Sequence, residues 1–213
     1  MEKDTGRVEA FSDGVFAIAI TLLILEIRVP DLGGVVSNGA LVAALVRTWP
    51  SLLAFLFSFF VILVMWMNHH EFMRWVQTCD YPFLFANGAV LLMVTFVPFP
   101  TAVVARYLGT DAASAAVAFY CATFFCIALA YQLLLRSVTH QRRLLRPDVP
   151  DDLVQRVHRA YNLGPLVYAA SIPLALVSAT AGLLLCASLW VLWSRLCYRA
   201  DRPYESQAAR GSA

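Results

Sequence analysis

Long apolar runs separated by short polar segments dominate this chain. Because about 20 apolar residues in helical conformation cross a bilayer, the pattern predicts an all-α integral membrane protein with six transmembrane helices. The turn between the last two should fall at Thr180, Ala181 and Gly182. The predicted spans lie near residues 8–28, 49–71, 83–106, 112–135, 160–180 and 182–198.

Proline positions refine these limits. Pro50 suits the first turn of the second helix, whereas Pro98 and Pro100 should kink or break the third. Pro150 followed by Asp151 and Asp152 is typical of a helix start and should lead into the fifth span. The segment 137–158 before that span is then predicted to be a solvated, positively charged loop.

Composition and charge give the setting. The chain is 60% hydrophobic and only 14% charged, and its net charge of +2 is too small to indicate a nucleic-acid partner. With both termini on one side of six spans, that side holds 13 of the 16 Lys and Arg residues. The positive-inside rule therefore predicts cytoplasmic termini in a multi-pass protein of the cell membrane, and the arginine-rich composition favours a bacterial inner membrane. Residues 1–202 are expected to form one transmembrane domain, and residues 203–213 a disordered cytoplasmic tail.

Signatures of enzymes and cofactors are missing from the sequence. It contains no G-x-S-x-G, H-E-x-x-H or Walker motif, so we expect no enzymatic activity and no cofactor. Adjacent His69, His70 and Glu71 point about 100° apart on a helix and do not make a metal chelate, so no metal is expected either. The five cysteines have no C-x-x-C pair and are interpreted as packing residues.

Ionisable and polar residues stand at the mouth of the first span, where hydrocarbon penalises them. On the six-span map, the end of the second span lies at the same depth. Side chains from both spans are therefore predicted to form a polar network, within or between subunits, that fixes the inner end of the first helix. If Arg7 and Asp13 are buried, replacing either should cost about 3–5 kcal/mol. The predicted network comprises Arg7, Phe11, Ser12, Asp13, Trp66, Asn68, His69 and His70.

A stripe of mostly apolar side chains follows helical spacing beyond this mouth. Its members are Phe11, Gly14, Ile18, Thr21, Leu22 and Leu25. Spacing alone is equally typical of a lipid-facing or core stripe. Ile20 and Ile24 should lie on the opposite side of the helix.

Two motifs closely resemble the prokaryotic members of the transmembrane protein 175 family of potassium channels. The first is Arg7-x-x-x-Phe11-Ser12-Asp13 followed by residues 14–22, and the second is Trp66-x-Asn68-His69-His70. The resemblance covers the first two helices residue by residue, and the other four only by number and spacing.

The resemblance implies a homotetramer in which the first helices line a central pore, surrounded by membrane lipid. It also implies a leaky, potassium-selective channel with no carbonyl filter, narrowed by Ile18, Leu22 and Leu25, with Thr21 offering hydroxyl groups to passing potassium ions. The motif network would tie helices together and not select ions. Two alternatives remain open at this point: a secondary transporter or proton-coupled carrier, which would need a broken helix at a midplane site, and a non-conducting membrane scaffold.

Overall fold

A computed structural model describes residues 5–34 and 36–200, apart from the side chains of residues 190, 191 and 195–200. Its elements are helical except for one isolated β-bridge. In chain order they are α1 (Thr5–Leu22), the 3₁₀ turn η1 (Leu23–Glu26), α2 (Asn38–Arg47), α3 (Trp49–Met73), α4 (Tyr81–Phe96), α5 (Pro98–Tyr107), α6 (Ala113–Thr139), the 3₁₀ turn η2 (His140–Arg142), α7 (Asp151–Val177) and α8 (Ala179–Ala200).

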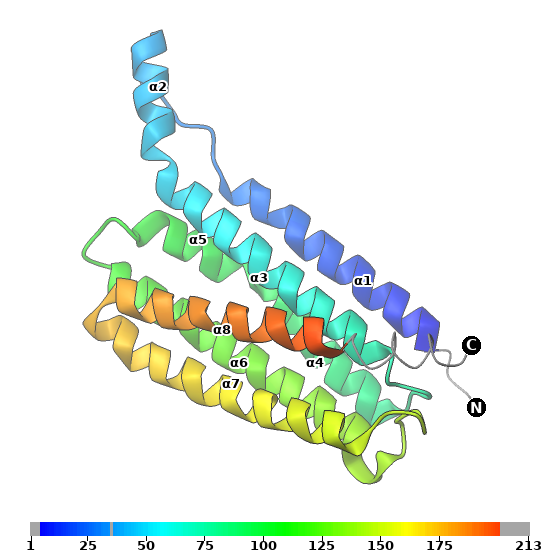
Figure 1. Ribbon diagram of the computed structural model, residues 1–213. Coiled ribbons are helices and arrows are strands. Elements are labelled where there is room, and N and C mark those ends of the chain that lie inside the picture. The colour runs from blue at the N-terminus through cyan, green and yellow to red at the C-terminus, as the bar shows by residue number, and fades with distance from the viewer. Residues whose placement is uncertain (1–4, 35, 201–213) are drawn as a thin grey trace, which may run out of the picture.

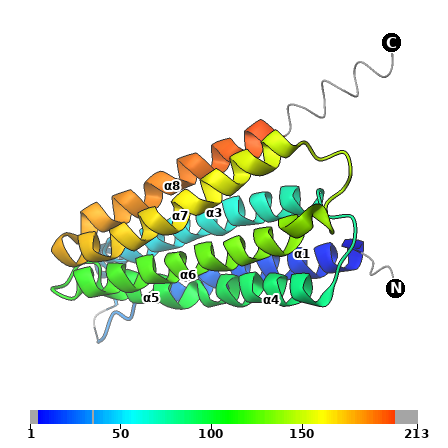
Figure 2. The same ribbon diagram turned by 90° about the horizontal axis from the view of Figure 1, so that it is seen from below.

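The helices form one elongated bundle (Figures 1 and 2). Five helical segments in the described part of the chain are long and apolar enough to cross a membrane, namely Thr5–Glu26, Trp49–Met73, Tyr81–Tyr107, Ala113–Arg142 and Asp151–Val177. Helix α8 packs antiparallel to α7, and the first residue of α1 lies at the same end of the bundle as the last turn of α8. These five segments confirm a multi-pass, all-helical architecture.

The third apolar run is interrupted where its prolines predicted. Helix α4 ends at Phe96, Val97 forms a turn, and α5 begins at Pro98. The Thr101 hydroxyl donates a hydrogen bond to the Val97 carbonyl over 2.8 Å. Its hydroxyl also lies 2.7 Å from that of Ser58, which lies 3.1 Å from the hydroxyl of Tyr120. The break is thus sealed by polar contacts to α3 and α6.

The predicted turn between the last two helices is wrong. Ser178 alone separates α7 from α8, and the Gly182 amide donates to its carbonyl over 3.0 Å. Gly182 serves in helix packing instead, because a Cβ at this position would lie 2.4 Å from the Cβ of Ala175. The absent side chain allows α7 and α8 to approach this closely.

The segment 137–158 is not simply a solvated loop. Helix α6 and η2 extend to Arg142 and α7 starts at Asp151, as its acidic start signal predicted. Leu145 is buried and pairs with Val76 in the β-bridge, so this loop is fastened to the one that follows α3. Its basic residues also have partners, since Arg143 forms an ion pair with Asp80.

Helix α2 was not predicted. Ser37 caps it by accepting a hydrogen bond from the Ala40 amide over 3.1 Å. None of its residues is buried, and it projects from the bundle at the end opposite the start of α1 (Figure 1). At 10 residues it is too short to cross a bilayer.

Helix α6 lies at the centre of the subunit and buries Tyr120, Phe124 and Leu134. Three of the cysteines, Cys79, Cys121 and Cys186, are buried and unbridged, in keeping with a packing role, while Cys126 is exposed. The side chain of Cys197 and the predicted tail 203–213 lie outside the description.

Candidate functional site

Helix α1 lies at the edge of the subunit and buries only one side. Ser12, Phe16 and Ala19 face the bundle, and Leu23 continues this side into η1. The predicted stripe occupies the opposite side: Gly14 and Thr21 are exposed, and the apolar members are 66% exposed at Phe11, 58% at Ile18, 42% at Leu22 and 70% at Leu25. The subunit therefore leaves a continuous apolar face of α1 uncovered.

The end of α1 tightens into a 3₁₀ turn. In this geometry residues three apart are eclipsed, so Leu25 lies in line with Leu22 along the helix. The same tightening corrects one expectation, because Ile24 is 52% exposed and does not face the core. Ile20 is half-buried. The exposed face thus broadens at this end.

Thr21 is the only hydroxyl on the exposed stripe. Its Oγ1 donates to the Ile18 carbonyl over 2.9 Å. With the proton turned toward the backbone, the lone pairs of the oxygen remain available to a cation on the exposed side.

A buried hydrogen-bond chain joins α1, α3 and α4 near the start of α1. Asn87 donates through Nδ2 to the Ser12 hydroxyl over 3.0 Å, and Ser12 donates to the Val8 carbonyl over 2.8 Å. Asn87 Oδ1 lies 2.8 Å from Nε2 of His69. Since the amide nitrogen is already a donor to Ser12, the amide oxygen must accept, and His69 Nε2 must carry a proton. All three side chains are buried, so the chain specifies how these helices meet.

The His69 ring is fully enclosed, with its centre 5.3 Å from that of Phe16. Its Nδ1 has no hydrogen-bond partner in the described structure. A protonated ring would leave a charged donor unsatisfied there, which favours the neutral imidazole in this arrangement.

A second, more exposed group lies at the same end. Trp66 donates through Nε1 to Asp13 over 2.8 Å and stacks on His70 with 5.7 Å between ring centres. His70 Nδ1 lies 3.1 Å from a Glu9 carboxylate oxygen. One ligand atom each from Glu9, Asp13 and His70 lies within 4.8 Å of the others, so these three residues have the spacing to hold a cation. These three residues differ from the adjacent His69, His70 and Glu71, whose side chains point too far apart to chelate one metal.

Three residues of the predicted network lie outside it within the subunit. Arg7 is exposed and pairs with no carboxylate among residues 5–34 and 36–200, so the suggested partnership with Asp13 is not formed. Asn68 faces away from α1, and its Nδ2 donates to the Val64 carbonyl of its own helix over 2.8 Å. Phe11 lies on the exposed face of α1 and also remains outside the hydrogen-bonded network.

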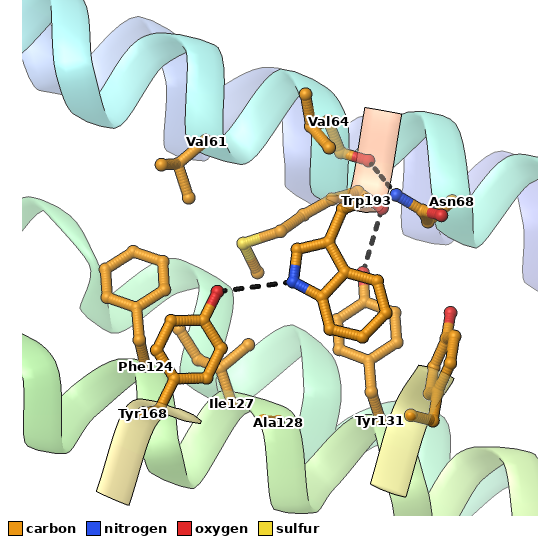
Figure 3. Close-up of a pocket in the computed structure, with 11 residues that line it drawn as sticks. Val61, Val64, Asn68, Phe124, Ile127, Ala128, Tyr131, Tyr168 and Trp193 are labelled. Atoms are coloured by element: carbon orange, nitrogen blue, oxygen red, sulfur yellow. Dashed lines mark hydrogen bonds between the residues drawn. The ribbon is translucent and has the colours of Figure 1, made fainter. Parts of the chain in front are cut away.

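Asn68 instead lines a cavity of about 50 Å³ among α3, α6, α7 and α8 (Figure 3). Opposite it, Trp193 Nε1 lies 3.4 Å from the Tyr168 hydroxyl, and Tyr131 donates to the Met65 carbonyl over 2.9 Å. A Cβ at position 164 would lie 2.7 Å from the Trp193 ring, so Gly164 makes room for the indole. This region is an aromatic packing centre, remote from the exposed face of α1.

Two residues of the site, Asn87 and Glu9, were not predicted from the sequence. Asn87 had a readable signal, because it is the only amide in the otherwise apolar run 83–94, and a buried amide within a span requires a partner. Glu9 is one helical turn before Asp13, which places both carboxylates on one side of α1.

Comparison with known proteins adds independent information. A sequence profile described as "Endosomal/lysosomal potassium channel TMEM175" matches residues 7–98. A potassium channel of Chamaesiphon minutus is 42% identical over 193 residues, covering 91% of this chain and 95% of that protein. A potassium channel of Streptomyces collinus is 45% identical, covering 83% and 84%. The crystal structure of a lysosomal potassium-selective channel TMEM175 homolog from Chamaesiphon minutus superimposes with a TM-score of 0.80 at 41% identity, covering 92% of this chain and 98% of that one.

Proposed function

This chain belongs to the TMEM175 family of potassium channels, and from that premise we propose that four copies surround a pore lined by their α1 helices. Membership makes it a potassium channel and not an enzyme, a transporter or a passive scaffold. The observation that carries the pore proposal is the uncovered face of α1, with Ile18 58% and Leu25 70% exposed. A single helix cannot enclose a water path, and rotational symmetry is the common way for identical chains to do so.

We propose that Ile18, Leu22 and Leu25 form a hydrophobic constriction. Apolar rings of this kind close a pore by excluding water and conduct once they widen. Thr21 lies between the first two of these positions, and its outward lone pairs would contact potassium ions after they shed part of their hydration. Potassium loses water more readily than sodium, which supports modest selectivity.

The buried chain through Ser12, Asn87 and His69 would hold α1 in the orientation that the pore requires. It fixes the inner end of the helix against α3 and α4 and leaves the stripe facing outward. Arg7 is exposed and would contact a neighbouring subunit. In this proposal it ties helices of different subunits together. These residues are positioning groups in this proposal and not part of the ion path.

The proposed placement in the membrane follows the charge distribution. With α8 as a sixth span, both termini lie on the side that holds 13 of 16 basic residues, which is cytoplasmic by the positive-inside rule. A bacterial inner membrane is the proposed location.

Purified protein in planar bilayers tests the pore itself. Unitary current steps with a reversal potential that follows the potassium gradient are expected. Slow, saturable flux without unitary steps would contradict the channel mechanism. Native mass spectrometry should show a tetramer, and a conducting monomer or dimer would exclude the four-helix pore.

The Ile18→Asn variant tests the constriction. A polar ring does not exclude water, so we expect a larger current and a weaker preference for potassium over sodium, measured as reversal potentials in paired gradients. Leu92→Asn is the matched control, because Leu92 is a 69% exposed apolar residue on α4. Equal effects on reversal potential from both variants would remove the reason to place the pore on the α1 stripe.

A further inference from the structure

A cavity of about 410 Å³ lies at the end of the bundle opposite the start of α1, where η1, α3 and α5 meet. Arg28, Arg106 and Glu26 supply its charges, and Ser51 and Tyr107 add hydroxyl groups. Basic residues are scarce at this end: of the 16 Lys and Arg residues, the sequence places Arg28, Arg47 and Arg106 here. Two of these three line the same cavity.

The charges in this cavity are not neutralised within the subunit. Neither Arg28 nor Arg106 takes part in an ion pair with any residue that the structure describes. The Arg106 guanidinium lies 5.8 Å from the centre of the Tyr107 ring, which holds it at the cavity wall. Guanidinium groups bind phosphate oxygens through paired, charge-assisted hydrogen bonds, and a carboxylate binds an ammonium group. Two guanidinium groups and one carboxylate therefore match a zwitterionic phosphate ester with a free amine.

Apolar surface adjoins the charged cavity. Val103 and Tyr107 also line a second cavity of about 230 Å³, which Ala112, Ala115 and Ala116 complete. Along α5, Phe99, Val103 and Arg106 share one side at helical spacing, and Phe99 is 56% exposed. An apolar strip therefore leads along α5 to the charged cavity, an arrangement that fits an amphiphile better than a soluble anion.

We propose that this cavity binds the headgroup of a phosphatidylethanolamine-type lipid. The phosphate contacts Arg28 and Arg106, the primary ammonium contacts Glu26, and an acyl chain follows Val103 and Phe99. Trp49 begins α3 and Tyr107 ends α5 at this end of the bundle, where aromatic residues mark the bilayer interface. Glu26 ends η1, so the lipid touches the end of the α1 segment. This lipid site does not depend on whether α1 lines an ion pore.

Native mass spectrometry of the detergent-solubilised protein tests this proposal with ethanolamine, choline and glycerol phospholipids that carry identical acyl chains. The wild type should retain the ethanolamine lipid at least tenfold better than either of the others. The double variant Arg28→Ala/Arg106→Ala should lose at least tenfold of that retention. Glu26→Gln should keep phosphate binding but abolish the preference for the ethanolamine headgroup. Arg47→Ala is the control at the same end and should bind as the wild type does.

Three results would overturn the assignment. They are equal retention of all three lipids by the wild type, unchanged retention by the double arginine variant, and an equal loss in Arg47→Ala. A further arm adds soluble phosphoethanolamine, which lacks an acyl chain and should not displace the lipid at equal concentration. Displacement would assign the cavity to a soluble phosphate ester instead of a lipid. Size-exclusion elution of each variant verifies that it is folded.

Discussion

Helices α1 and α6 are similar in hydropathy but are held in the subunit in different ways. In the most apolar stretch of the span that contains α6, 56% of the residues are buried, against 22% in the span that contains α1. Helix α6 is fixed by many packed side chains such as Phe124, whereas α1 packs only one side, through Phe16 and Ala19, and adds hydrogen bonds around Ser12. A helix that the subunit packs on one side only keeps its other, apolar face uncovered.

The largest expected effect lies on α6. Phe124→Ala removes a fully enclosed ring that lies 4.8 Å from Tyr120 and 5.9 Å from Tyr168, measured between ring centres. Loss of the ring and creation of a cavity should lower the free energy of unfolding by about 3–5 kcal/mol. Unfolding in mixed micelles, followed by circular dichroism, measures it. Leu133→Ala is the control, because the Leu133 side chain on the same helix is 54% exposed. An equal loss of stability there would contradict the assignment of α6 as the core.

An intermediate effect is expected for the buried chain. Asn87→Ala leaves the Ser12 hydroxyl and His69 Nε2 without their partner, at a cost of about 1–3 kcal/mol for a buried unsatisfied group. Asn68→Ala is a matched control, because this amide bonds only the carbonyl of its own helix. The same unfolding assay applies to both variants. If the two substitutions cost the same, the chain through Asn87 does not fix α1.

A smaller loss of stability is expected for the more exposed group around Asp13 and Trp66. The sequence-based value of about 3–5 kcal/mol assumed a buried Arg7–Asp13 pair, but Arg7 is exposed and Asp13 accepts from Trp66. Trp66→Phe should therefore cost only about 1 kcal/mol, the usual net value of one hydrogen bond. Arg7→Ala should leave the unfolding of the separated subunit unchanged and weaken the proposed tetramer, as measured by native mass spectrometry across a dilution series. A normal tetramer with altered ion selectivity would instead place Arg7 in the ion path.

The smallest effect on subunit stability is expected on the stripe itself. Leu25→Ala removes a side chain that is 70% exposed in the subunit, so the unfolding free energy should change by no more than about 0.5 kcal/mol. Current should nevertheless rise, because a narrower side chain widens an apolar ring. Bilayer recordings measure this rise, and Leu133→Ala again serves as the exposed control. A stability loss comparable to that of Phe124→Ala would show that Leu25 packs in a core.

Periodicity and proline chemistry were enough to predict much of this fold. The break at Val97 and the helix start at Asp151 follow from backbone constraints that act within a few residues, so the sequence shows them directly. The turn predicted at residues 180–182 was wrong because Gly182 is required by contact with Ala175, and such a contact between helices leaves no local signature. Burial of Leu145 was missed for the same reason, since its partner Val76 lies in another loop.

The candidate site, too, was predicted from the sequence only in part. Helical spacing identified the exposed stripe, apart from Ile24, which the 3₁₀ turn rotates outward. The polar network was predicted at the correct end of α1, but spacing could not tell that Asn68 faces the bundle interior or that Arg7 lies free of Asp13. Helices α3 and α4 supply the partners, and their rotation about their own axes depends on packing that no single segment encodes.

The single-residue turn at Ser178 bears on how the protein enters a membrane during synthesis. The α7 segment has a mean hydropathy of 1.4, the lowest of the five candidate spans, and two prolines, Pro165 and Pro173, lie inside it. Such a segment partitions weakly when it meets the translocon alone. With α8 as the proposed sixth span, only Ser178 between it and α7, and Gly182 packed against Ala175, the two helices are expected to enter the lipid as one helical hairpin. Co-translational insertion of the second half of the protein should therefore be a single concerted event, delayed until α8 has left the ribosome.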